Sequence, residues 1–175
     1  MQDLKMVISK AAKAKAWVLF IFYLFLLNWF LFVSVGGTVR DEYFDKRIVH
    51  WVPMKHTYQT LSIIISGNFG AENKVGYTYL AFRNIIGNIL LFMPFGFLAP
   101  ILLPFVRSLK AIVLFTGAFS LMAELIQFVL KIGVFDIDDV IFNLIGGTLG
   151  YLCLYGFRNL LFRNNLSKDL NREAF

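Results

Sequence analysis

The sequence has few charged residues and only one cysteine. Charged side chains make up 16% of its 175 residues, whereas they make up about a quarter of a typical soluble domain. This scarcity argues against a soluble globular protein. The single Cys153 lies inside an apolar run, so it permits no internal disulfide and has no metal-ligand spacing.

Long apolar runs take the place of the missing charge. Apolar residues make up 58% of the chain, and twenty of its residues are Phe. A membrane-spanning helix needs about 20 mainly apolar residues, and four runs reach roughly that length. We therefore predict one all-α domain over residues 1–175, a polytopic membrane protein whose bundle of four transmembrane helices spans about 16–35, 85–106, 111–130 and 140–157.

The longest polar segment, residues 36–84, separates the first two predicted spans. Apolar side chains recur there at helical spacing, and Pro53 stands at a plausible helix start. We predict an amphipathic segment along the membrane interface. His50 and His56 are the only histidines. Their separation fits no common ligand spacing on one helix, which favours two interfacial polar side chains over a metal pair.

Positive charge is unevenly distributed between the loops. Residues 1–15, the 107–110 turn and the 158–175 tail together hold ten Lys or Arg and three acids, whereas 36–84 and 131–139 hold seven of each. Cytoplasmic loops carry the excess of Lys and Arg. We therefore predict a multi-pass protein of the cell membrane with both termini, including the basic tail 158–175, in the cytoplasm. The net charge of +6 reflects this distribution and does not indicate nucleic-acid binding.

Polar side chains gather where the second, third and fourth predicted spans reach the outer face. Glu124 is the only carboxylate within a predicted span, and Asp139 and Asn143 share one helix face. Polar groups at membrane depth are costly and usually functional. We predict an outward-facing binding pocket formed by Arg83, Asn84, Asn88, Glu124, Gln127, Asp136, Asp138, Asp139 and Asn143.

Three other interpretations of these residues stay open. Glu124 and Arg83 can form a buried ion pair that only sets helix packing. Asp136, Asp138 and Asp139 can bind a divalent cation, Mg²⁺ or Ca²⁺, through carboxylate oxygens. The same acids can instead cap a helix N-terminus.

Four blocks of the sequence resemble the VanZ-like family. Residues 88–97 (NILLFMPFGF) are similar to its N-x-L-x-F-x-P-x-G-F block, and residues 124–127 (ELIQ) to its E-L-x-Q block. Residues 135–151 are similar to its F-D-I-D-D-x-x-x-N-x-x-G-x-x-x-G-Y block, and residues 52–55 (VPMK) to a shorter I-P-F-K element. The resemblance covers residues 16–157 and implies a small multispanning membrane protein. The member that gives the family its name is associated with low-level resistance to the glycopeptide teicoplanin, so the resemblance implies a phenotype and no reaction.

Three functions are compatible with these predictions. The first is a non-enzymatic factor that binds a membrane lipid, a cell-envelope precursor or a glycopeptide antibiotic at the outer leaflet, which the outward position of the pocket favours. The second is an intramembrane enzyme acting on a lipid-linked envelope precursor with a divalent cation; no Ser or Cys nucleophile has a visible base. The third is a proton-coupled transporter that uses Glu124, for which four spans would have to form an oligomer.

Overall fold

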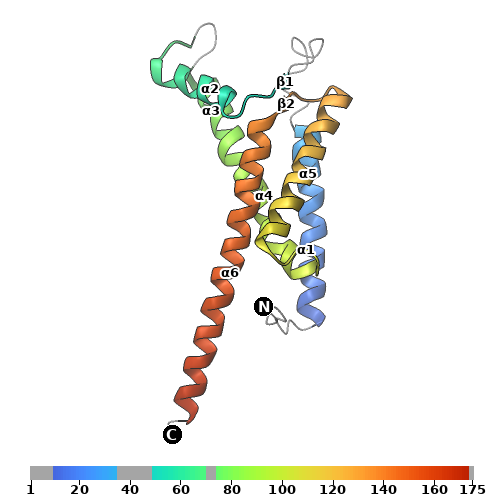
Figure 1. The fold of residues 1–175 in the computed structure, drawn as a ribbon, viewed down its shortest axis with the longest axis vertical. Helices are drawn as coiled ribbons and strands as arrows, with labels where there is room; N and C mark the ends of the chain where they lie inside the picture. The colour runs from blue at the N-terminus through green and yellow to red at the C-terminus, as the bar shows by residue number, and fades with distance from the viewer. Residues whose placement is uncertain (1–9, 35–48, 70–73, 174–175) are drawn as a thin grey trace.

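The computed structural model describes residues 10–34, 49–69 and 74–173. Helices make up most of these residues, and two very short strands join segments from the two halves of the chain (Figure 1). The elements are α1 (Lys10–Trp29), the π-helical segment η1 (Phe30–Ser34), β1 (Val49–His50), α2 (Lys55–Ser66), α3 (Lys74–Phe82), the π-helical segment η3 (Arg83–Gly87), α4 (Asn88–Leu102), α5 (Leu109–Leu130), β2 (Phe135–Asp136) and α6 (Ile137–Glu173).

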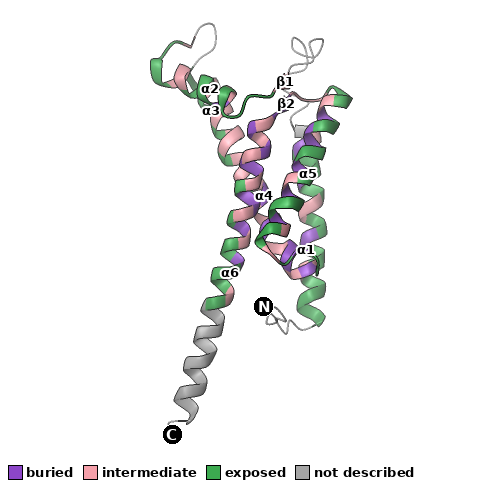
Figure 2. Ribbon diagram, viewed as in Figure 1, coloured by how far each residue is buried: buried purple, intermediate pink, exposed green. Residues whose placement is uncertain are grey.

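Four helical stretches within the described residues are long and apolar enough to cross a membrane. They are Lys10–Phe32, Lys74–Leu102, Leu109–Leu130 and Ile137–Asn159. Large apolar side chains cover their outer faces, and buried residues lie between the helices (Figure 2). So much exposed apolar surface suits contact with lipid rather than water. The predicted all-α polytopic membrane fold is confirmed.

The helix boundaries differ from the prediction at several places. The first helix, α1, begins at Lys10 rather than at residue 16. The second span begins at Lys74 rather than at residue 85, because α3 and η3 run directly into α4. It ends at Leu102 instead of residue 106. Residues 158–173 of the predicted tail continue α6 as a helix, and the sequence has no Gly or Pro after Gly156 that would end it.

The predicted interfacial segment, residues 36–84, is described in part, as β1, α2, α3 and the start of η3. Helix α2 points away from the bundle at the same end as the two strands (Figure 1). Tyr58, Leu61 and Ile65 share one of its faces and are exposed, while Thr57 is its buried residue. Residues 36–48 and 70–73 of the segment lie outside the described residues.

The contact between α4 and α6 depends on glycine. A Cβ atom added at Gly146 would overlap the carbonyl of Ile89, and one added at Gly150 would overlap the carbonyl of Met93. One added at Gly96, on the opposite helix, would overlap the backbone of Gly147. The two backbones therefore touch with no side chain between them, which confirms the close helix packing that the small residues predicted.

The first helix packs against α4 through aromatic and aliphatic side chains. Phe20 lies in a buried cluster with Phe95, and Leu27 lies in a second one with Phe92. The hydroxyl of Tyr23 donates a 2.8 Å hydrogen bond to the carbonyl of Leu91. These contacts hold α1 along α4.

The bundle has two unlike ends (Figure 1). The strands, α2 and the start of α6 lie at one end. The start of α1 and the last turns of α6 lie at the other. The polar residues of interest gather at the strand end.

Candidate functional site

The two strands bring distant segments together at this end of the bundle. β1 pairs with β2 in parallel, with Val49 opposite Phe135 and His50 opposite Asp136. The ring of Trp51 packs on that of Phe135 with their centroids 4.8 Å apart. The pairing sets His50 beside a carboxylate that lies 86 residues further along the chain.

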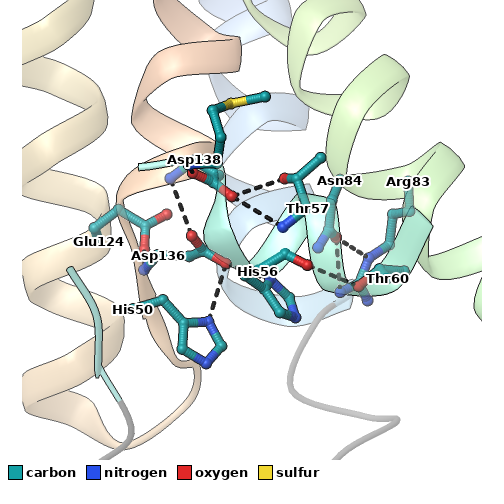
Figure 3. Close-up of polar contacts among 10 residues, drawn as sticks. His50, His56, Thr57, Thr60, Arg83, Asn84, Glu124, Asp136 and Asp138 are labelled. Carbon is teal, nitrogen blue, oxygen red and sulfur yellow. Dashed lines mark hydrogen bonds and ion pairs between the residues drawn. The ribbon is translucent and has the colours of Figure 1, made fainter. Parts of the chain in front are cut away.

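Asp136 is the centre of a group of polar contacts (Figure 3). Its Oδ2 atom lies 3.2 Å from Nδ1 of His50 and 2.8 Å from Nδ1 of His56. Its Oδ1 atom accepts a 3.0 Å hydrogen bond from the backbone N–H of Asp138, so Asp136 also caps the N-terminus of α6. We call His50, His56, Glu124, Asp136 and Asp138 the Asp136 cluster.

Glu124 supports the backbone of β2. This side chain is buried on α5, and its Oε2 atom accepts a 3.0 Å hydrogen bond from the N–H of Asp136. No ion pair joins it to Arg83 in the described part of the chain; Arg83 instead donates from Nε and Nη2 to Oδ1 of Asn84, at 3.4 Å each. The buried Glu124–Arg83 pair considered from the sequence is therefore not formed.

Asp138, in the first turn of α6, caps the N-terminus of α2. Its Oδ2 atom accepts hydrogen bonds from the backbone N–H of Thr57 at 3.1 Å and from the Thr57 hydroxyl at 2.7 Å, and its Oδ1 atom accepts one from the N–H of Met54. Met54 precedes α2 in a left-handed conformation (φ 62°) and supplies no side-chain cap. Asp138 thus satisfies N–H groups that a helix start leaves without partners.

Asp139 lies beside the Asp136 cluster. Its Oδ1 atom is buried and has no partner among the described residues. It interacts electrostatically with Glu124, Asp136, Arg83 and His56. Asn88 stands half-buried at the first position of α4.

Two residues of the predicted pocket are used for helix packing instead. Gln127 donates a 2.8 Å hydrogen bond from Nε2 to the carbonyl of Leu31, which joins α5 to η1. Asn143 donates a 2.8 Å hydrogen bond from Nδ2 to Oγ of Ser120, which joins α6 to α5. The structure therefore does not bring these two amides to Asp136.

The sequence did not predict that the two histidines meet. Both rings face one oxygen of Asp136, and their centroids are 4.3 Å apart. Their spacing along the chain carried no signal, since His50 is in β1 and His56 is in α2. The available signal was their position on either side of the short block 52–55 that resembles a family motif.

Electrostatics favour a charged His56–Asp136 pair. The hydrogen bond to Asp136 raises the pKa of His56 above its usual value, although partial burial acts against it. Burial acts to raise the pKa of Asp136. Hydrogen bonds from His56, from the N–H of Asp138 and from His50 outweigh that effect, so the pKa of Asp136 lies below its usual value.

One group of side chains in the described residues has the donors for a metal ion. His50, His56 and Asp136 each offer one ligand atom, and these atoms lie within 4.8 Å of one another. Asp138 and Asp139, which the sequence had grouped with Asp136 as metal candidates, are not in this set. Both oxygens of Asp138 are already used to cap α2.

The chain is similar to known proteins in its sequence. A family model described as VanZ/LLP1 matches residues 20–162. Protein VanZ of Enterococcus faecium is 44% identical to this chain over 78 residues, which are 45% of this chain and 47% of that protein. The match thus spans about half the length of that relative. No solved structure shows significant similarity to the chain.

Proposed function

The chain belongs to the VanZ/LLP1 family, and from that premise we propose that it binds the polar headgroup of a cell-envelope lipid or lipid-linked precursor at the outer face of the membrane. Through this binding it alters the access of glycopeptides such as teicoplanin to the envelope. The observation that carries the proposal is the Asp136 cluster at one end of a four-span bundle. Polar groups held at such a position are usually functional.

The charge distribution supports an outward orientation. The start of α1 and the last turns of α6 lie at the end opposite the cluster (Figure 1), and the flanking segments hold most of the unbalanced Lys and Arg. The positive-inside rule places those segments in the cytoplasm. The Asp136 cluster then faces outward.

The surroundings of the cluster suit a lipid headgroup. The side chains of His50 and His56 are 31% and 35% exposed, so both remain accessible from the end of the bundle. The apolar face of α2, which starts at the cluster, is exposed and suits the membrane interface. Arg83 is half-buried beside Asn84, and a guanidinium is well suited to phosphate.

Cysteine labelling tests the orientation. In a Cys153→Ala background we expect Gln59→Cys, on the exposed side of α2, to react with an impermeant thiol reagent in intact cells. Lys10→Cys, at the start of α1, should react only after permeabilisation. Reversed labelling would place the cluster in the cytoplasm and end the proposal.

Susceptibility testing addresses the role of the cluster. Cells that express the wild-type chain should tolerate more teicoplanin than cells without it, and His56→Gln and Arg83→Gln should each remove that gain. Gly156→Ala, at a position with nothing within 4 Å, is the matched control at equal membrane abundance. If the variants protect as well as the control does, headgroup binding by the cluster is not the basis of the phenotype.

A second candidate function is an enzyme acting on the same headgroup. The observation that favours it is the carboxylate at Nδ1 of His56, because such a partner orients an imidazole and strengthens it as a general base. The purified protein would then change the mass of an added lipid-linked precursor, as measured by mass spectrometry. A His56→Gln variant that converts the precursor at the wild-type rate would exclude this role.

A further inference from the structure

We infer that His50, His56 and Asp136 together bind one divalent ion of the first transition series, with Zn²⁺ the best match. The inference rests on the geometry and chemistry of these three side chains. It goes beyond headgroup binding and does not depend on it, since an ion can be bound whatever ligand the cluster takes.

The distances between the ligand atoms fit a small ion. Oδ2 of Asp136 lies 3.2 Å from Nδ1 of His50 and 2.8 Å from Nδ1 of His56. Bonds of about 2.0–2.1 Å in a tetrahedral site set ligand atoms roughly 3.3 Å apart. All three ligand atoms lie within 4.8 Å of one another, so rotation of the two imidazole rings about their side-chain bonds would bring them to a shared ion.

The donor types select the class of ion. Two imidazole nitrogens and one carboxylate oxygen suit zinc and its neighbours in the transition series. Mg²⁺ and Ca²⁺ prefer sites made of oxygen atoms, so the structure does not support the cation class considered from the sequence. Three protein ligands leave one position of a tetrahedral ion open, and the partly exposed histidines place that position toward the end of the bundle.

A set of hydrogen bonds already holds the ligands in place. The strand pairing fixes His50 opposite Asp136. The N–H of Asp138 binds the second oxygen of Asp136, and Glu124 binds its backbone N–H. Asp138 also anchors the first turn of α2, which carries His56. Such outer contacts are typical of metal sites, where they orient the ligands.

The local charge gives an independent reason for a cation. Asp139 interacts electrostatically with the carboxylates of Glu124 and Asp136, and Arg83 and His56 oppose this effect with positive charge. One oxygen of Asp139 is also buried without a hydrogen-bond partner among the described residues. Acidic groups crowded into a low-dielectric region repel one another, and a divalent ion on Asp136 reduces that repulsion.

Metal analysis of the purified protein tests the inference directly. The chain should be isolated with a tag that contains no histidine, exposed to Zn²⁺ and then passed through a desalting column. We expect about one Zn²⁺ per chain by elemental analysis, and at least a tenfold lower content in His50→Gln and in His56→Gln. Gly156→Ala is the matched control, because nothing lies within 4 Å of an added Cβ at that position.

A wild-type chain that retains no Zn²⁺, or histidine variants that retain it fully, would overturn the inference. A loss of Zn²⁺ from Gly156→Ala equal to that from the histidine variants, in protein that remains folded, would also overturn it, because the loss would then not report on the two imidazole rings.

Chemical modification gives a second measurement that needs no variant. His50 and His56 are the only histidines in the chain, so acylation of histidine by diethyl pyrocarbonate reports on this site alone. We expect Zn²⁺ to protect both rings from the reagent, and equal concentrations of Mg²⁺ to protect neither. Equal modification with and without Zn²⁺ would contradict coordination even if the histidine variants failed to fold.

Discussion

The α4–α6 contact and the Asp136 cluster are built in opposite ways. Along α4 and α6, Gly146 and Gly150 let two backbones touch, and no polar side chain takes part in these approaches. In the Asp136 cluster, side chains from β1, α2, α5, β2 and α6 are joined by hydrogen bonds. The α4–α6 contact leaves no room for an added side chain, whereas the Asp136 cluster depends on the identity of each polar group.

The two regions have different roles, because the α4–α6 contact positions the helices and the Asp136 cluster supplies the polar groups of the candidate site. The α4–α6 contact holds α6 against α4. Within the cluster, Asp136 lies directly before α6 and Asp138 lies in its first turn. Damage to the contact should therefore remove the cluster as well. Damage to the cluster should leave the bundle folded, because the buried apolar clusters around Phe20 and Leu27 do not include its residues.

The largest effect is expected from a side chain placed between α4 and α6. Gly150→Leu should destabilise the protein by about 3 kcal/mol or more, since overpacking commonly costs about 1–3 kcal/mol and the added atoms would meet a rigid backbone. Gly156→Leu is the control, because nothing lies within 4 Å of a Cβ at that position on the same helix. The measurement is the fraction of monodisperse protein after heating in detergent, and equal loss in both variants would refute the glycine contact.

The next effect is expected from removal of the cap on α2. Asp138→Ala leaves the N–H of Met54 and both donors of Thr57 without their acceptor, at a cost of about 2–3 kcal/mol. Thr57→Val removes the hydroxyl alone and should cost about 1 kcal/mol. Thermal melting gives the totals, and hydrogen exchange should show faster exchange confined to α2. Faster exchange spread through α4 and α6 would show that the two regions are not independent.

The sequence predicted the helical bundle better than the cluster. Four apolar runs are sufficient to identify spans, and Gly146 and Gly150 indicated a close contact, because both signals are local and periodic. The pairing of His50 with Asp136 joins segments 86 residues apart, and no local pattern encodes it. Glu124 was recognised as important, but its partner is a backbone N–H, and the sequence cannot show where a backbone group points. The π-helical segments likewise left no signal.

A smaller effect should follow from loss of the support under β2. Glu124→Ala removes the acceptor for the N–H of Asp136 and should cost about 1–2 kcal/mol. Glu124→Gln keeps an acceptor oxygen and should retain most of the stability. Because Glu124 and Arg83 form no ion pair, adding Arg83→Gln to Glu124→Ala should give additive changes in melting temperature. Recovery of stability in the double variant would show instead that these two residues are paired.

The smallest effect concerns the pH dependence of the metal-free protein. The raised pKa of His56 means that its contribution to stability is fully present below the ordinary histidine pKa of about 6.5 and is lost as pH rises through the raised value. The lowered pKa of Asp136 means that its contribution is present above about pH 4 and is lost as pH falls through the lowered value. The pair therefore stabilises most between about pH 4 and 6.5, and solvent screening of a histidine that is 35% exposed keeps the effect small. In chelator-treated protein, the melting temperature of the wild type relative to His56→Gln should be highest in this window and should decline toward pH 9, whereas Gly156→Ala should follow the wild type throughout. A difference in melting temperature between wild type and His56→Gln that does not change with pH would mean that His56 and Asp136 meet as neutral partners. The Asp136 cluster would then differ from the α4–α6 contact in geometry but not in charge.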